Sequence, residues 1–253
     1  MNEMRIVMIG SGNVAYHLSK AFKEAELNVV QVFGRNEEAL KAIAEENQLP
    51  YSTTDLAEAD LYILCVKDDA VAEVSQHITN VDALVAHTSG SLPKEILEGN
   101  YRKASFYPLQ TFSKTKFLDY SEIPFFVEAE TTEDAATLKT IALKISPRVM
   151  EADYEKRKYI HLTAVFVCNF VNHLYARAKE IADAQGIPFY YFLPLIEETT
   201  DKIYHIPPKE AQTGPAVRQD QRVLELHKAI IKDPMQLKIY EIMNQSIKQM
   251  YEL

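Results

Sequence analysis

The chain has 253 residues, with 36 acidic and 27 basic side chains and a formal net charge of −9. An apolar fraction of 47% beside 25% charged residues is typical of globular proteins, and it excludes disordered and collagen-like classes. The length allows one large domain or two modest ones. The acidic balance argues against a nucleic-acid partner, because such a partner selects a basic face.

Membrane and secreted classes are also disfavoured. The longest unbroken apolar run, Leu61–Val66, is far shorter than the ~20 residues that span a bilayer. The start of the chain, Met1–Met4, lacks the basic stretch and long apolar segment of a secretory signal. Cys65 and Cys168 both lie in apolar sequence, which indicates reduced, buried thiols. We therefore expect a cytoplasmic protein without a membrane partner.

The first ~150 residues alternate short apolar runs with helical stretches, which is typical of βαβ units around a parallel sheet. The expected strands are Arg5–Ile9, Asn28–Phe33, Leu61–Val66, Ala83–His87, Lys103–Tyr107, Phe125–Glu128 and Arg148–Glu151. The expected helices follow the first strand to about Ala25 and then cover Glu37–Glu46, Ala70–Ile78 and Glu133–Ile145. Pro108–Pro124 is expected to be a long polar loop at the edge of the sheet.

Helical patterns dominate from Asp153 onward. A long helix is predicted over Tyr154–Gln185, ended by Gly186 and a following proline. Its middle, Ile160–Ala176, is nearly all apolar, and a helix apolar on most sides is buried on most sides. We expect that part to pack against a second domain or a second subunit. The predicted fold is α/β: a Rossmann-type, mostly parallel sheet over residues 1–152 and an all-α domain over 153–253.

A glycine turn follows the first strand and opens the first helix. Gly10-Ser11-Gly12-Asn13-Val14-Ala15 has the G-x-G-x-x-A spacing of a dinucleotide site. Its first glycine makes the turn, and its second lets the backbone approach a pyrophosphate held by free N–H groups at the helix start. We assign Gly10, Ser11, Gly12, Asn13 and Val14 to cofactor binding. A tight turn without a ligand is the alternative.

The end of the second strand favours NADP over NAD. An NAD site usually places Asp or Glu about 20 residues after the glycines, and none lies between Asn28 and Asn36. Arg35 instead offers a planar cation that suits a 2′-phosphate, although an exposed loop charge is the alternative. Val66 and Lys67 end the third strand and are predicted to flank the cofactor, with Asp68 as a helix N-cap.

Three further motifs accompany the turn: His87–Ser91 (HTSGS), Tyr107–Phe112 (YPLQTF) and Thr213–Asp220 (TGPAVRQD). Together they resemble the Rossmann-like NADP oxidoreductase family with an uncharacterised helical C-terminal domain. That family is similar to the 6-phosphogluconate and β-hydroxyacid dehydrogenase-like group, which includes pyrroline-5-carboxylate reductase. The resemblance spans nearly the whole chain and implies NADP as cofactor and a homodimer formed through the C-terminal helices.

Four features depart from these patterns. Tyr107 stands where the family usually has His, and Gln219 stands where it usually has Gly, which suggests that the backbone there needs no glycine-only conformation. Val165 occupies the position of the lysine acid/base of the hydroxyacid dehydrogenases, four residues before Asn169. The serine- and threonine-rich C-terminal signature of pyrroline-5-carboxylate reductase is missing. A simple hydroxyacid dehydrogenase is therefore disfavoured.

Candidate reactive groups lie on the long helix. At about 100° per residue, His161, Cys168, Asn169 and Asn172 fall within an arc of about 100°. A polar stripe on an apolar helix is costly to bury without partners. We predict that His161 is a general acid and that Asn169 donates to a substrate oxygen, with Asn172 as a substrate contact. A structural stripe at a subunit interface is the alternative.

Two loops complete the candidate site. Ser89 and Gly90 follow a strand, where a hydroxyl and a backbone N–H can hold substrate; we assign Ser89 to catalysis and both residues to substrate binding. Arg218 is predicted to bind a substrate carboxylate, and an ion pair with Asp220 that only fixes the loop is the alternative. No metal is expected, because the sequence has no tight cluster of His, Asp and Glu.

The sequence therefore predicts an NADP-dependent oxidoreductase. Hydride would pass between the nicotinamide and a small carbonyl or imine compound in the interdomain cleft. A non-catalytic NADP(H)-binding sensor or regulatory protein is the alternative, and the missing lysine and Tyr107 favour it. A deazaflavin:NADP reductase would need a second large cofactor pocket, which no motif marks.

Overall fold

The computed structural model describes residues 4–253, so the expectation about a secretory signal concerns three residues outside the described part. The chain divides into two compact units, Met1–Asn169 and Phe170–Leu253. The sheet ends at Glu151, next to the boundary predicted at Ala152, whereas the units divide later because the following helix is bonded to the sheet. Within residues 4–253, no helix is long and apolar enough to cross a bilayer.

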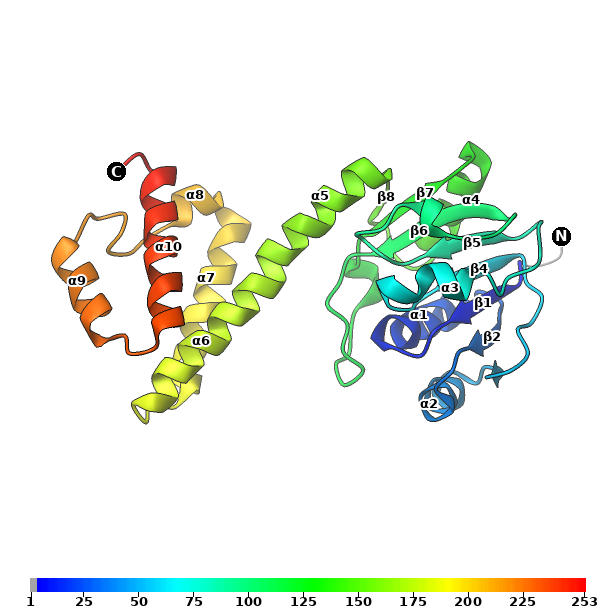
Figure 1. Cartoon of the computed structure of the whole chain (residues 1–253), viewed down its shortest axis with the longest axis horizontal. Coiled ribbons are helices and arrows are strands. Elements are labelled where there is room, and N and C mark those ends of the chain that lie inside the picture. The colour runs from blue at the N-terminus through cyan, green and yellow to red at the C-terminus, as the bar shows by residue number, and fades with distance from the viewer. Residues whose placement is uncertain (1–3) are drawn as a thin grey trace. The chain divides into compact units, whose positions relative to one another are not determined.

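The first unit is built on one eight-stranded sheet (Figure 1). Its strands are β1 (Ile6–Ile9), β2 (Val29–Phe33), β3 (Tyr51–Ser52), β4 (Leu61–Leu64), β5 (Leu84–His87), β6 (Arg102–Pro108), β7 (Phe125–Ala129) and β8 (Val149–Glu151). The order is β3-β2-β1-β4-β5-β6-β7-β8, and among the strand pairs of residues 4–253 only β6–β7 is antiparallel. The prediction of a Rossmann-type, mostly parallel sheet is confirmed. The two-residue β3 is too short to give a periodic signal in sequence.

Alternation along the strands divides the core into two layers. Ile6 and Met8 face the layer covered by α1 (Asn13–Glu24), α2 (Glu37–Asn47) and α4 (Thr132–Leu143). Val7 and Ile9 face the opposite layer, which α3 (Val71–Ser75) helps to cover. Every residue of β1, β4 and β5 is buried, as expected for central parallel strands between two layers. The C-terminal ends of these strands thereby meet at one edge.

The long helix of the sequence analysis is present but not uniform. It consists of α5 (Tyr154–Ala164), a π-helical turn over Val165–Phe170 and α6 (Val171–Ala184). A π-turn rotates less per residue than an α-helix, so the arc computed for Cys168, Asn169 and Asn172 at 100° per residue is wrong. The expected stop is confirmed: Gly186 has φ +68° and precedes Pro188.

The second unit is entirely helical in structure (Figure 1). Besides α6 it contains α7 (Leu193–His205), α8 (Pro208–Ala211), α9 (Gln221–Ile230) and α10 (Pro234–Met250). The His227 ring on α9 bonds the Tyr240 hydroxyl on α10 at 3.0 Å, and Gln236 on α10 bonds Glu180 on α6 at 3.1 Å. These bonds join α9 and α6 to α10.

The apolar stretch Ile160–Ala176 is exposed in the single chain: Val167 is 68% exposed and Leu162 is 49% exposed. Its expected packing against a second domain or a second subunit stays a prediction. Farther along, Tyr191 and Leu195 are also about two-thirds exposed. Of the described residues in the second unit, only Ala182, Ala216 and Leu224 are buried. A single chain therefore leaves much of the apolar surface of its helical unit uncovered.

Candidate functional site

The glycine turn has the backbone that the fingerprint demands. Gly10 has φ +133°, a conformation that side chains disfavour, and a Cβ there would overlap the Cys65 carbonyl oxygen at the end of β4. The turn is tied to β2 by the Gly10 N–H, which donates to the Phe33 carbonyl at 2.8 Å. It thus lies where β1 separates β2 from β4, at the reversal of strand order where this fold class binds nucleotides.

The start of α1 is open for an anion. Within the described part of the chain, a Cβ on Gly12 would meet no atom within 4 Å, and no side chain caps the helix. The first turn of α1 carries no acidic residue. Unpaired N–H groups and the positive end of the helix dipole therefore face open space above Gly12. These observations fit the pyrophosphate of a dinucleotide.

The other predicted cofactor residues lie around the same edge. Arg35 is exposed after β2 and forms no ion pair within residues 4–253. Val66 and Lys67 follow β4, and Lys67 is exposed. The prediction of Asp68 as an N-cap is wrong, because Lys67 holds that position and the Asp68 carboxylate accepts the Ser91 hydroxyl instead.

A second cluster is formed by three elements at the ends of β5 and β6. The Tyr107 hydroxyl lies 3.1 Å from His161 Nδ1, joining β6 to α5. Gly90, after β5, lies against both rings: a Cβ there would be 2.7 Å from Tyr107 Cζ and 2.8 Å from His161 Nδ1. His161 is half-buried and Tyr107 is buried. The structure thus brings the predicted acid His161 beside Gly90. It also places Tyr107, which was not among the predicted site residues, in the same cluster.

Burial sets the protonation of the groups around this cluster. Burial raises the pKa of Tyr107 above its usual value, and the nearby Arg157 charge only partly offsets this. Burial, with the Arg157 charge, lowers the pKa of His87 to about 4. The Ser89 N–H donates to His87 Nδ1 at 3.1 Å, so the neutral His87 ring carries its proton on Nε2. Tyr107 is therefore a neutral phenol and His87 a neutral imidazole near pH 7.

Arg157 and Glu128 hold α5 on the sheet. Arg157 is fully buried; its Nη1 lies 2.5 Å from Glu128 Oε2, and its Nη2 donates to the Leu92 carbonyl at 2.6 Å. Lys94 pairs with the other Glu128 oxygen at 2.9 Å. Because His161 follows Arg157 by four residues, both side chains lie on one face of α5. The ion pair therefore fixes the turn of α5 that precedes His161.

The remaining predicted residues are less closely gathered. Ser89 Oγ accepts the Ser91 N–H at 3.1 Å in the loop after β5. Asn169 is exposed in the π-helical turn of the first unit. Asn172 and Arg218 are exposed and belong to the second unit, whereas Tyr107 and His161 belong to the first. Their roles stay predictions.

The alternative of an ion pair between Arg218 and Asp220 is wrong. The Asp220 carboxylate accepts the Val223 N–H and caps α9, and no ion pair within residues 4–253 joins it to Arg218. Gln219 has φ +56°, a left-handed conformation that glycine favours, and a glutamine occupies it here. The backbone at this position therefore does not require glycine, as expected.

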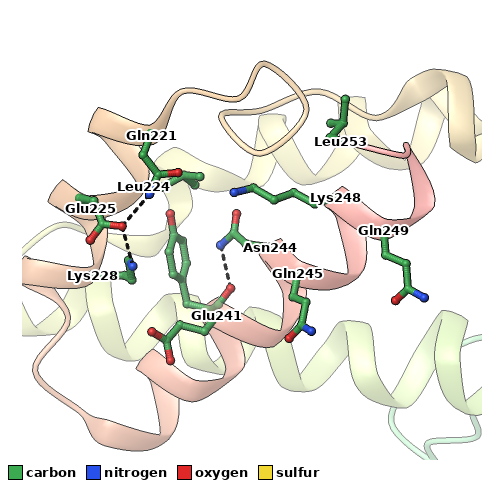
Figure 2. A pocket seen from close by; sticks show the side chains of 11 residues that line it. Gln221, Leu224, Glu225, Lys228, Glu241, Asn244, Gln245, Lys248, Gln249 and Leu253 are labelled. Carbon is green, nitrogen blue, oxygen red and sulfur yellow. Dashed lines mark hydrogen bonds and ion pairs between the residues drawn. The ribbon is translucent and has the colours of Figure 1, made fainter.

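A cavity of the second unit lies elsewhere, between α9 and α10 (Figure 2). It measures about 720 Å³, and one ion pair lies in its wall: Lys228 is 2.7 Å from Glu225, which also accepts a hydrogen bond from Gln221 at 2.7 Å. None of the predicted site residues lines it. Among residues 4–253, no group of three His, Cys, Asp or Glu side chains could hold a metal ion.

Comparison with known proteins gives two family matches along the chain. Residues 5–88 match the family described as NADP oxidoreductase, coenzyme F420-dependent, and residues 123–247 match a domain of unknown function. A putative NADP oxidoreductase from Bacteroides fragilis, of known crystal structure, is 46% identical; the match covers 98% of each chain with a TM-score of 0.91. The chain belongs to this NADP oxidoreductase family. The prediction of NADP as cofactor is thereby confirmed.

More distant structures share the fold. A Thermotoga maritima protein is 22% identical over 98% of both chains, with a TM-score of 0.76. A pyrroline-5-carboxylate reductase from Coxiella burnetii is 16% identical, with a TM-score of 0.60, over 99% of this chain and 94% of that one. No curated protein matches the chain.

Proposed function

We propose that this NADP oxidoreductase reduces, or forms by oxidation, a small carbonyl or imine compound, with His161 as the proton donor or acceptor. NADP(H), when bound, supplies or accepts the hydride. The observation that carries the proposal is the hydrogen bond between Tyr107 and His161 beside Gly90, at the strand ends that follow the nucleotide turn. A titratable ring fixed by a neutral phenol at this edge suits general acid–base catalysis.

The proton step assigns a task to each nitrogen of His161. In the reducing direction the ring is an imidazolium, whose Nδ1–H donates to the Tyr107 oxygen and whose Nε2–H is offered to the substrate. Nε2 gives its proton to the substrate oxygen or nitrogen as hydride reaches the neighbouring carbon, which leaves a neutral ring. Ser89 and Asn169 are proposed to hydrogen-bond the same substrate, and Arg218 and Asn172 to contact its remaining polar groups.

The fold supports the proposed class of substrate. We place the chain with 6-phosphogluconate and β-hydroxyacid dehydrogenase-like proteins, and the fold it shares with a pyrroline-5-carboxylate reductase supports cyclic imines as test compounds beside small oxo-acids. The Val165 position argues against a simple hydroxyacid dehydrogenase, since it removes the lysine acid. His161 would take over that proton transfer from another turn of the helix.

The experiment is NADPH oxidation by the purified full chain against a panel of oxo-acids and cyclic imines. We expect turnover with at least one compound, and we expect His161→Gln to slow that turnover at least about a hundredfold while NADPH affinity stays unchanged. His173→Gln, an exposed change on α6, is the matched control. Nucleotide binding without turnover of any compound would favour the sensor, and equal activity in His161→Gln would remove the proposed acid.

We also propose a cytoplasmic homodimer formed through the C-terminal helices. The exposed apolar side chains of the helical unit support it, because large exposed apolar patches mark association surfaces. Sedimentation equilibrium at micromolar concentration should give a dimer mass. Leu195→Asp, on that surface, should shift the mass toward the monomer, whereas Phe117→Asp, exposed in the first unit, should not. A monomeric wild-type protein would contradict the proposal.

A further inference from the structure

A loop from the far side of the sheet lies on the nucleotide turn. We call residues 109–121, between β6 and β7, the strap. Asn13 Nδ2, in the turn, donates to the Phe112 carbonyl at 2.9 Å. On the next turn of α1, His17 Nε2 lies 2.9 Å from the Ser113 carbonyl. These contacts join two of the sequence motifs, the glycine turn and YPLQTF, although about 100 positions separate them.

The strap is fixed at both ends of this contact. His17 Nδ1 also lies 3.0 Å from the Tyr120 hydroxyl, and the Phe112 ring packs on the His17 ring with centroids 5.3 Å apart. His17 and Tyr120 are buried. Since a buried ring with both nitrogens engaged has little freedom, the strap is held in one position against α1.

The strap places the Lys114 ammonium beside the glycine turn. Lys114 Nζ donates to the Ser11 carbonyl at 3.1 Å and lies 5.8 Å from the centroid of the Tyr16 ring. Its side chain is half-buried, and no carboxylate within residues 4–253 pairs with it. The ammonium has three donors, of which the Ser11 carbonyl accepts one. A positive charge with spare donors is therefore fixed beside the uncapped start of α1.

We propose that Lys114 is a direct ligand of the NADP(H) pyrophosphate, so that the strap forms part of the nucleotide site. The proposal rests on NADP binding by the glycine turn and adds a residue that the fingerprint does not contain. Lys114 and the N–H groups of α1 would share the diphosphate charge, while Arg35 reads the 2′-phosphate. Lys114 would therefore contribute to the binding of both NAD and NADP, whereas Arg35 would favour NADP.

Calorimetric titrations of the purified full chain with NADPH and with NADH test this division. Because both nucleotides carry the pyrophosphate, Lys114→Met should weaken both by a similar factor of at least tenfold. Arg35→Ala should weaken NADPH alone. Lys116→Met is the matched control, since Lys116 is an exposed lysine of the same strap, and it should leave both affinities within about twofold. Thermal unfolding of each variant without nucleotide reports any loss of fold.

A second measurement uses the unchanged protein. Lysine acetylation followed by mass spectrometry should show that saturating NADPH protects Lys114 and leaves Lys116 reactive. Equal reactivity of Lys114 with and without NADPH would overturn the proposal, as would unchanged affinities in Lys114→Met. A loss confined to NADPH would transfer Lys114 to the 2′-phosphate and overturn its pyrophosphate role. If the wild-type protein binds neither nucleotide, the proposed function itself fails first.

Discussion

Arg157 and Glu128 form a buried ion pair, 2.5 Å between Nη1 and Oε2, that joins the start of α5 to strand β7. Removing one partner from such a pair leaves an uncompensated buried charge, which costs more than the intact pair contributes. The pair also stands one helical turn before His161. Its loss should therefore affect both stability and the site.

Glu128→Gln should lower the free energy of unfolding by about 3 kcal/mol, because Arg157 then keeps its burial without a counter-charge. Glu122→Gln is the matched control: Glu122 pairs with Arg148 at the same 2.5 Å, but both side chains are more than half exposed. The control should change stability by less than about 1 kcal/mol. Urea unfolding measures both, and equal losses would show that burial does not govern the first pair.

Gly10 and Gly12 should respond differently to the same added methyl group. Gly10→Ala forces a side chain onto φ +133° and into the Cys65 carbonyl, so we expect an insoluble or strongly destabilised protein. Gly12→Ala meets no protein atom and should fold with an unchanged melting temperature. Its methyl would stand where the pyrophosphate approaches, so NADPH affinity should fall at least tenfold. Calorimetry and thermal unfolding check the pair; normal NADPH binding by Gly12→Ala would contradict the assigned turn.

Local patterns predicted most of the first unit. The strand ending at Ile9, the glycine turn and the following helix are encoded within about twenty consecutive residues, by apolar runs and by one spacing of glycines. Strand β3 was missed, and the helix predicted over Ala70–Ile78 is present but shorter, as α3 over Val71–Ser75, because tertiary packing decides such short elements. The π-helical turn at Val165 also left no pattern, since its sequence is as apolar as a plain helix.

The candidate site could be predicted only in part. His161 stood out as a polar residue on an apolar helix, but its partner Tyr107 lies 54 positions earlier and entered the sequence analysis only as a departure from a family pattern. Lys114 gave no signal at all, because a lysine in a polar loop is ordinary until the loop is placed. Contacts between residues so far apart in sequence depend on which strand ends lie at the same edge of the sheet. The strand order determines this, and no local motif reveals it.

His87 should make stability depend on pH. Its pKa is about 4 in the folded protein against 6.5 as its ordinary value, so between these limits the unfolded chain binds more protons. The stability contributed by the neutral ring is present above pH 6.5 and is lost as the pH falls toward 4, by about 3 kcal/mol. His87→Asn, which keeps an acceptor for the Ser89 N–H, should lose this dependence.

Urea unfolding at several pH values measures the difference between wild type and His87→Asn. Carboxylates whose pKa is lowered, such as Asp60, affect both proteins alike and cancel in the comparison. His77→Asn is the control, because His77 is exposed, and it should follow the wild-type curve. Parallel curves for wild type and His87→Asn from pH 7 to 4 would show that the ring is not held neutral.

Gly90→Ala should separate catalysis from cofactor binding. A Cβ at this position would stand 2.7 Å from the Tyr107 ring and 2.8 Å from His161 Nδ1, so one ring must move and the hydrogen bond between them must lengthen. We expect kcat to fall at least tenfold while NADPH affinity stays within about twofold, since the glycine turn is untouched. Tyr107→Phe removes the same hydrogen bond without adding bulk, and its kcat should fall in the same direction. If both variants keep the wild-type kcat, His161 does not depend on Tyr107 for its orientation, and the proton step assigned to this pair is wrong.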